Sequence, residues 1–127
     1  MESAERMASR EEVSSFIRSS FRSVWSLELL LLIRREARFW TQQELIGALR
    51  ASDLVVSHGL DTLSAAGLVI IDDKGNALYS PTPGASELVD GAAELYAKSP
   101  DAVRRLIVGR RASGLEAFAD AFRIRKE

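Results

Sequence analysis

The chain has 127 residues, of which 46% are hydrophobic and 28% are charged, a composition typical of one globular domain. Its 17 basic and 18 acidic side chains give a formal net charge of −1, so binding to nucleic acid or an anionic membrane would require local segregation of charge. The sequence has no cysteine, which excludes disulfides, thiolate metal sites and cysteine nucleophiles and favours a reducing compartment.

The longest apolar run does not predict a membrane span. It covers residues 27–33, contains Glu28 and is followed by two arginines, far short of the roughly 20 residues that cross a bilayer. Residues 1–12 alternate in charge and lack the apolar segment of an export signal. We therefore expect a cytoplasmic protein with no membrane partner.

Residues 11–40 have a helical pattern. Residues 11–38 contain neither glycine nor proline, and their apolar positions recur every three or four residues. The many serines in this segment are mediocre helix formers, so a break within residues 20–26 would divide it into two helices. Residues 26–40 are apolar almost all round and are expected to form the central helix.

Two short helices are predicted to follow in tandem. Thr41 and Glu44 have the spacing of a capping box, which predicts a helix from Gln42 to about Arg50. Either Ser52 or Asp53 can cap the next helix, and Gly67 suits its left-handed end. The apolar side chains that this helix is expected to bury are Leu54, Val56, Leu60 and Leu63.

A β-hairpin and further helices complete the predicted order. The segments LVIID and ALYSPT, joined by the turn DKGN, predict two short strands that end before Pro81 and Pro83. The next helix has Leu88, Ala92 and Leu95 at helical spacing, and Ser99-Pro100 starts another. The last predicted helix carries an apolar stripe of Leu115, Phe118 and Phe122.

This order of helices and hairpin resembles the winged helix-turn-helix regulators of bacteria, most closely those of the MarR type. The likeness is carried by Val56-Ser57, Leu60, Leu63 and Gly67-Leu68-Val69, with TQQELIGAL as the preceding helix, and covers residues 24–83. It implies a mainly α fold with a small β-hairpin, a winged helix-turn-helix with additional N- and C-terminal helices. We expect a single domain, 1–127, with N-terminal and central helices in 11–40, the helix-turn-helix and wing in 41–83, and a C-terminal helical extension in 84–127.

The resemblance implies a transcriptional regulator that binds duplex DNA through the second helix of the motif and the wing. Serine, threonine and histidine side chains can hydrogen-bond to base edges, whereas Asp53 and Asp61 would face phosphates. Residues 41–83 hold two basic and five acidic residues, so their formal charge is 2 − 5 = −3. The positions that correspond to DNA-binding residues are Ser52, Val55, Ser57, His58 and Thr62 on the helix, with Lys74 and Asn76 in the wing.

The acidic motif supports an alternative function. A winged helix that does not bind DNA would act as a protein-interaction adaptor, docking a basic partner through its acidic face. Arginines elsewhere in the chain provide a phosphate-binding surface if they fold beside the second helix, and otherwise form a solvated face with local carboxylate partners. These arginines are Arg34, Arg35, Arg38, Arg104, Arg105, Arg110 and Arg111, with Arg123, Arg125 and Lys126 near the end of the sequence.

The sequence predicts no enzyme, no metal site and no cofactor. His58 is the only histidine, and we expect it to be exposed on the helix or else partly buried with a bonded ring nitrogen. Asp72 and Asp73 are expected to be turn residues. Three aromatic residues near the central helix, Trp25, Phe39 and Trp40, either line a small-molecule pocket or pack in the core.

The terminal helices predict a homodimer. Their apolar stripes lie outside the winged core, so they either fold back on the same chain or form an interface between two copies, as the flanking helices of MarR-type proteins do. A two-fold dimer would place two second helices side by side, as a palindromic site requires.

Overall fold

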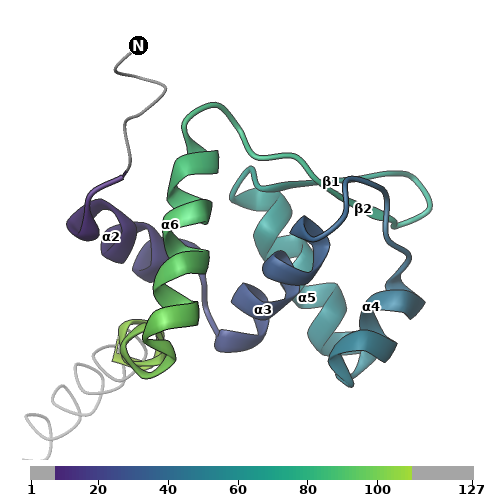
Figure 1. The fold of residues 1–127 in the computed structure, drawn as a ribbon. Coiled ribbons are helices and arrows are strands. Elements are labelled where there is room, and N and C mark those ends of the chain that lie inside the picture. Colours follow the sequence, from purple (N-terminus) through teal and green to yellow (C-terminus); the bar gives the residue numbers. More distant parts are fainter. Residues whose placement is uncertain (1–7, 110–127) are drawn as a thin grey trace, which may run out of the picture.

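The computed structural model describes residues 8–109, which are mainly helical with one small antiparallel sheet (Figure 1). This confirms the predicted class of a mainly α fold with a β-hairpin. The elements in chain order are α2 (Arg10–Ser20), α3 (Val24–Arg34), α4 (Gln42–Leu49), α5 (Asp53–Ala65), β1 (Val69–Ile71), β2 (Ala77–Tyr79), α6 (Ala85–Lys98) and a helical stretch over residues 100–109.

The predicted break near residue 20 is confirmed, because both helices have their own caps. Ser9 and Glu12 form a capping box at the start of α2, and Ser23 and Ser26 form one at the start of α3. Phe21 lies between the helices and is only 1% exposed. The chain therefore turns at a buried aromatic residue, with serines on the helix ends.

The central helix is shorter than predicted. α3 ends at Arg34, whereas the sequence suggested helix up to Trp40. Trp40 instead pairs with Ala77 of β2: its amide donates to the Ala77 carbonyl at 2.7 Å, and the Ala77 amide donates back at 2.9 Å. Its indole is buried and donates to the Ile33 carbonyl at 3.2 Å. Cross-strand pairing and burial of this large ring prevail over local helix preference.

The tandem helices follow the predicted caps. The Thr41–Glu44 capping box starts α4, and the Ser52 hydroxyl accepts from the Val55 amide at the start of α5. Val56, Leu60 and Leu63 are buried against the core as predicted, but Leu54 is 64% exposed and the prediction of its burial is wrong. The other three lie on one face of α5, and Leu54 falls on the opposite face.

α5 packs closely on α3 because α5 contains a glycine at the contact. A Cβ atom built on Gly59 would lie 2.7 Å from Leu29 Cδ2. Figure 1 shows α3 and α5 in the middle of the molecule, with α4 to one side and the hairpin along the top. One part of the core thus lies between the tandem helices, α3 and the inner face of the hairpin, and the same cluster continues to α2, α6 and residues 100–109.

The hairpin forms directly after α5, as the sequence predicts. Val69 pairs with Tyr79, Ile70 with Leu78 and Ile71 with Ala77. Gly67 has φ 77°, the left-handed conformation that suits glycine at the end of a helix.

α2, α6 and the stretch 100–109 form the other side of the molecule (Figure 1). α6 is joined to α3 by two polar contacts: Arg34 binds Asp90 at 2.7 Å, and the Tyr96 hydroxyl donates to Glu28 at 2.6 Å. Of the predicted α6 stripe, Ala92 is buried while Leu88 and Leu95 are half-buried.

Among residues 8–109, no helix is long and apolar enough to cross a membrane. The predicted stripe of Leu115, Phe118 and Phe122 lies outside the described residues, as do Arg110, Arg111, Arg123, Arg125 and Lys126.

Candidate nucleic-acid interface

The outward face of α5 is uncharged to acidic. With a helical turn every 3.6 residues, the face opposite Val56 and Leu60 presents Leu54, His58 and Asp61, and all three are exposed. Val55, at 37% exposure, lies beside this stripe. Ser57 and Thr62 are half-buried at its edges. Of the two alternatives for His58, exposure on the helix and partial burial, the structure shows exposure, and the outward stripe contains no lysine or arginine.

Two of the predicted DNA-binding hydroxyls already make internal hydrogen bonds. Ser52 Oγ accepts from the Val55 amide at 3.1 Å, and Thr62 Oγ1 donates to the His58 carbonyl at 3.0 Å. The Ser52 hydroxyl can still donate a hydrogen bond to a partner, and the Thr62 hydroxyl oxygen can still accept one.

The hairpin tip is organised by Asp72. Its carboxylate accepts from the amides of Lys74 and Asn76 at 2.9 and 2.8 Å, and from Asn76 Nδ2 at 3.1 Å. These bonds, above all the one from the Asn76 amide, lower the pKa of Asp72. Asp72 is thus a turn residue, as predicted, and the Asn76 side chain holds the turn. Lys74 is left exposed at the tip.

A second carboxylate of the motif is engaged at the start of α4. Glu44 accepts from the Thr41 amide and binds Arg38 Nη1, each at 2.9 Å, and both contacts lower its pKa, the amide more strongly. Arg38 also binds Glu36 at 2.7 Å, and its guanidinium carbon lies 4.0 Å from the centre of the Trp40 ring. The other three acidic residues in 41–83, Asp53, Asp61 and Asp73, form no side-chain hydrogen bond or ion pair with another described residue.

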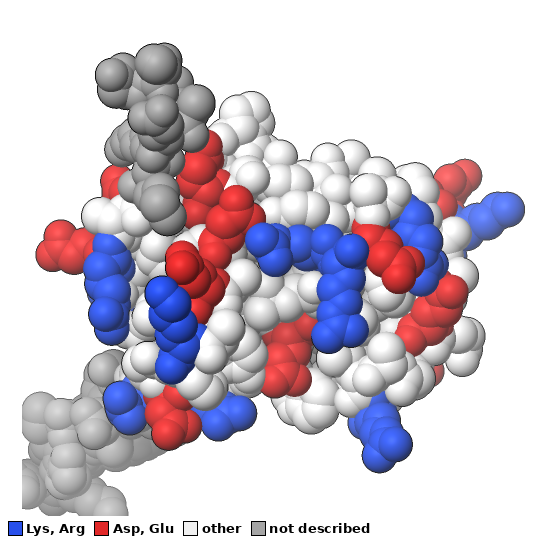
Figure 2. Space-filling model, viewed as in Figure 1, with Lys and Arg blue, Asp and Glu red and all other residues white. Residues whose placement is uncertain are grey.

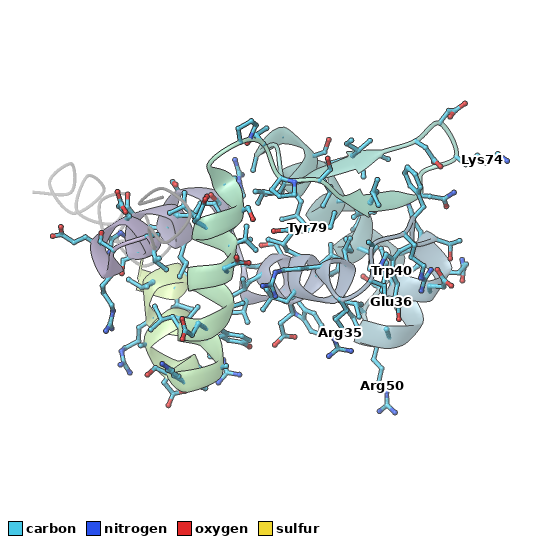
Figure 3. All side chains as sticks on the ribbon, turned by 45° about the horizontal axis from the view of Figure 1, so that its top comes forward. Arg35, Glu36, Trp40, Arg50, Lys74 and Tyr79 are labelled. Atoms are coloured by element: carbon cyan, nitrogen blue, oxygen red, sulfur yellow. The ribbon has the colours of Figure 1, made fainter. Side chains whose placement is uncertain are left out.

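Arg50 is a candidate site residue that the sequence did not indicate. It follows α4 in the left-handed conformation, with φ 54° and ψ 41°, and is the one non-glycine residue of 8–109 with positive φ. Its side chain is exposed and, like Lys74, forms no ion pair within the described part of the chain. Figure 3 shows both side chains extending away from the body of the molecule. The sequence signal for this conformation is that no glycine or asparagine directly follows α4 to take the left-handed position at its end.

Three of the five predicted arginines within residues 8–109 have carboxylate partners. Arg34 binds Asp90, Arg38 binds two glutamates, and Arg104 binds Asp101 at 3.4 Å. Figure 2 shows basic and acidic side chains interspersed over the face in view rather than gathered by sign. The alternative of a solvated face with local partners thus describes Arg34, Arg38 and Arg104. Arg35 is exposed without an ion pair among residues 8–109.

The three aromatic residues near α3 do not line a common pocket. Trp40 is buried in the core, whereas Trp25 and Phe39 are 45% and 43% exposed. The prominent hollow of the described residues is an open groove of about 880 Å³ between α2 and α6, lined by side chains such as Phe16 and Leu88. Residues 8–109 contain no group of three or more side chains suited to hold a metal ion.

Comparison with known proteins identifies no relative. No protein-family model, no curated protein and no solved structure matches the chain. The role of the α5 surface therefore has to be inferred from its geometry and its charge.

Proposed function

We propose that the chain is a winged helix-turn-helix protein that binds duplex DNA, with α5 as the recognition helix and the β1–β2 hairpin as the wing. The element order supports this fold, since α3, α4 and α5 pack on one another and the wing follows α5 directly. Trp40, between α3 and α4, forms an isolated antiparallel bridge with Ala77, which ties the start of the tandem helices to the wing.

One observation carries the proposal of DNA binding: the segments that precede and follow α5 in the chain each have an exposed cation without an ion pair among residues 8–109. Arg50 lies in the turn before α5, and Lys74 lies at the wing tip. In helix-turn-helix proteins the N-terminal residues of the second helix contact base edges, while flanking cations bind phosphates. The partial positive charge of the α5 N-terminus also favours an approaching phosphate.

The formal charge of −3 is only partly balanced within the chain. Glu44 binds Arg38, which lies outside the motif, whereas the amide bonds to Asp72 keep its carboxylate ionised, so four carboxylates oppose Arg50 and Lys74. Two phosphate contacts per copy give a slope of log K against log salt of roughly −1.8, and a dimer gives about −3.6. We therefore propose weak, strongly salt-dependent binding that benefits from a homodimer.

A second candidate function is a protein-interaction adaptor. The observation that favours it is the outward stripe of α5, in which Leu54, His58 and Asp61 provide apolar and acidic groups but no cation. Such a stripe fits a partner with a basic, partly apolar surface.

Salt-dependent binding to mixed genomic DNA fragments tests the first function. We expect retention at about 20 mM salt that is lost steeply by about 200 mM, and weaker retention for Lys74→Glu and Arg50→Glu. Arg18→Glu is the matched control, because Arg18 is an exposed cation on α2. No retention of the wild-type chain at low salt would refute DNA binding and leave the adaptor, whose interaction Asp61→Lys should abolish.

A further inference from the structure

We infer that α5 recognises thymine methyl groups in the major groove through Leu54 and Val55. This inference rests on the proposed DNA binding and names the kind of sequence that the same surface would select. It starts from two apolar side chains that the fold leaves in water.

Leu54 and Val55 are adjacent in the first turn of α5 and are 64% and 37% exposed. Single exposed apolar residues are common on protein surfaces. These two, however, lie at the end of α5 that enters the groove in a helix-turn-helix complex. Other large exposed apolar residues, such as Ile70 and Val108, lie on other elements.

The other side chains on the outward face of α5 limit the bases that this helix can recognise. It has no arginine or lysine for the paired acceptors of guanine, and no asparagine or glutamine for adenine. The major-groove feature that an apolar side chain can contact is the C5-methyl group of thymine. The absence of bidentate groups therefore leaves methyl contact as the main source of selectivity at the start of α5.

Asp61 adds a second position to the expected site. Its exposed carboxylate is repelled by phosphates but can accept from the N4 amino group of cytosine. It follows Leu54 by seven residues, roughly 10 Å along the helix axis, which corresponds to about three base pairs. A half-site with thymines facing the helix start and a cytosine about three base pairs away fits this spacing.

The charges at this turn are one exposed carboxylate, Asp53, which opposes DNA, and one exposed guanidinium, Arg50, which favours it. Arg50 immediately precedes the capping segment, extends into solvent and has no ion pair among residues 8–109. In a complex with a basic protein this guanidinium would be repelled, whereas beside a groove it would meet a phosphate.

The test begins with the full chain and a pool of randomised duplexes. After selection at low salt, each thymine of the enriched site is replaced in turn by deoxyuridine, which lacks only the methyl group. We expect the affinity to fall about three- to fivefold for each methyl that is contacted, in keeping with burial of one carbon. Replacement of the same thymine by 5-methylcytosine should keep more affinity than replacement by cytosine.

Variants then assign the effect to named side chains. The Leu54→Ala/Val55→Ala chain should bind thymine and deoxyuridine duplexes equally while its salt slope stays unchanged. Val108→Ala is the matched control, since Val108 is 52% exposed on the stretch 100–109 outside the motif, and it should keep the sensitivity to deoxyuridine. Thermal unfolding of each variant confirms that the fold is intact.

The possible failures are distinguishable. DNA binding with equal affinity for thymine and deoxyuridine duplexes would overturn the inference and leave the proposed function standing. No DNA binding at low salt would overturn both. Binding of a basic protein through Leu54, with no DNA binding, would assign the same turn to the adaptor function and overturn the inference.

Discussion

Replacement of Arg50 by glycine should stabilise the protein and weaken its binding to DNA. Arg50 has φ 54° and ψ 41°, where the Cβ atom of an L-residue is crowded by the following carbonyl at a cost of roughly 1–2 kcal/mol. Glycine removes this cost but loses about 0.5–1 kcal/mol more backbone entropy on folding. The net gain is about 0–1.5 kcal/mol. No ion pair is lost within residues 8–109, because the exposed side chain makes none there.

The same substitution removes one phosphate contact from the proposed interface. We expect the slope of log K against log salt to become shallower by about 0.9 for each bound copy. Urea unfolding of Arg50→Gly, with the midpoint compared at constant m-value, measures the first effect, and binding to a selected duplex across a salt series measures the second.

Two further substitutions separate backbone strain from charge. Arg50→Lys keeps both the charge and the strained conformation, so stability and salt slope should stay near those of the wild type. Arg50→Asn tolerates the left-handed conformation but has no charge, so it should resemble glycine in binding. A glycine variant that is less stable than the wild type would refute the strain argument. A stabilised variant with unchanged salt slope would remove Arg50 from the interface.

Three other substitutions test the packing and the titration of named groups. Gly59→Ala should lower the free energy of unfolding measured in urea, because the new Cβ atom would lie 2.7 Å from Leu29 Cδ2. Overpacking costs roughly 1–3 kcal/mol, which exceeds the gain of about 1 kcal/mol in helix propensity. Equal or greater stability of the variant would show that α3 and α5 separate easily. Tyr79→Phe should raise stability at pH 7 by up to about 1 kcal/mol, because the buried Tyr79 hydroxyl has no hydrogen-bond partner among the described residues. Burial raises the pKa of Tyr79, so the wild type should lose stability above about pH 10, and this loss should be smaller in the variant. Asp72→Asn should make the stability of the protein depend less on pH in acid. The lowered pKa of Asp72 gives stability that is present above about pH 4 and lost as the pH falls. A urea midpoint that changes between pH 2 and pH 6 by as much in the variant as in the wild type would contradict this.

The helix ends were predictable because their determinants are local. Thr41 and Glu44 meet within one turn, Ser52 caps the amide three residues on, and Gly67 adopts the positive φ that its lack of a Cβ allows. The break between α2 and α3 follows the same logic, with serine caps on each helix. Such interactions involve residues within about four positions of each other, so the sequence alone specifies them.

The errors concern contacts between distant segments. Trp40 continues a helical pattern, yet it pairs with Ala77, which is 37 positions further along the chain. Leu54 keeps the apolar spacing of a buried residue, but α3 and α4 contact α5 on the opposite face. The periodicity of apolar residues identifies an apolar stripe on a helix, but it does not show how much of that stripe neighbouring elements bury. The conformation of Arg50 was likewise hidden, since a helix end in the left-handed region usually carries glycine.

Several features that the sequence did not reveal lie in one short segment, residues 50–55, and their position supports a functional role for this segment. Between residues 50 and 55 the chain has a strained arginine with an exposed charge, followed by an exposed leucine and an exposed valine. The fold gains little from any of them: glycine relaxes the backbone at Arg50, and alanine suits an exposed helix position better than valine. Three departures from the most stable choice within six residues, at and just before the end of α5 that faces a groove in helix-turn-helix complexes, are best explained by a partner that binds there. The triple variant Arg50→Gly/Leu54→Ala/Val55→Ala should thus be at least as stable as the wild type while binding DNA more weakly and without sensitivity to deoxyuridine, and a clear loss of stability would mean that the segment serves the fold.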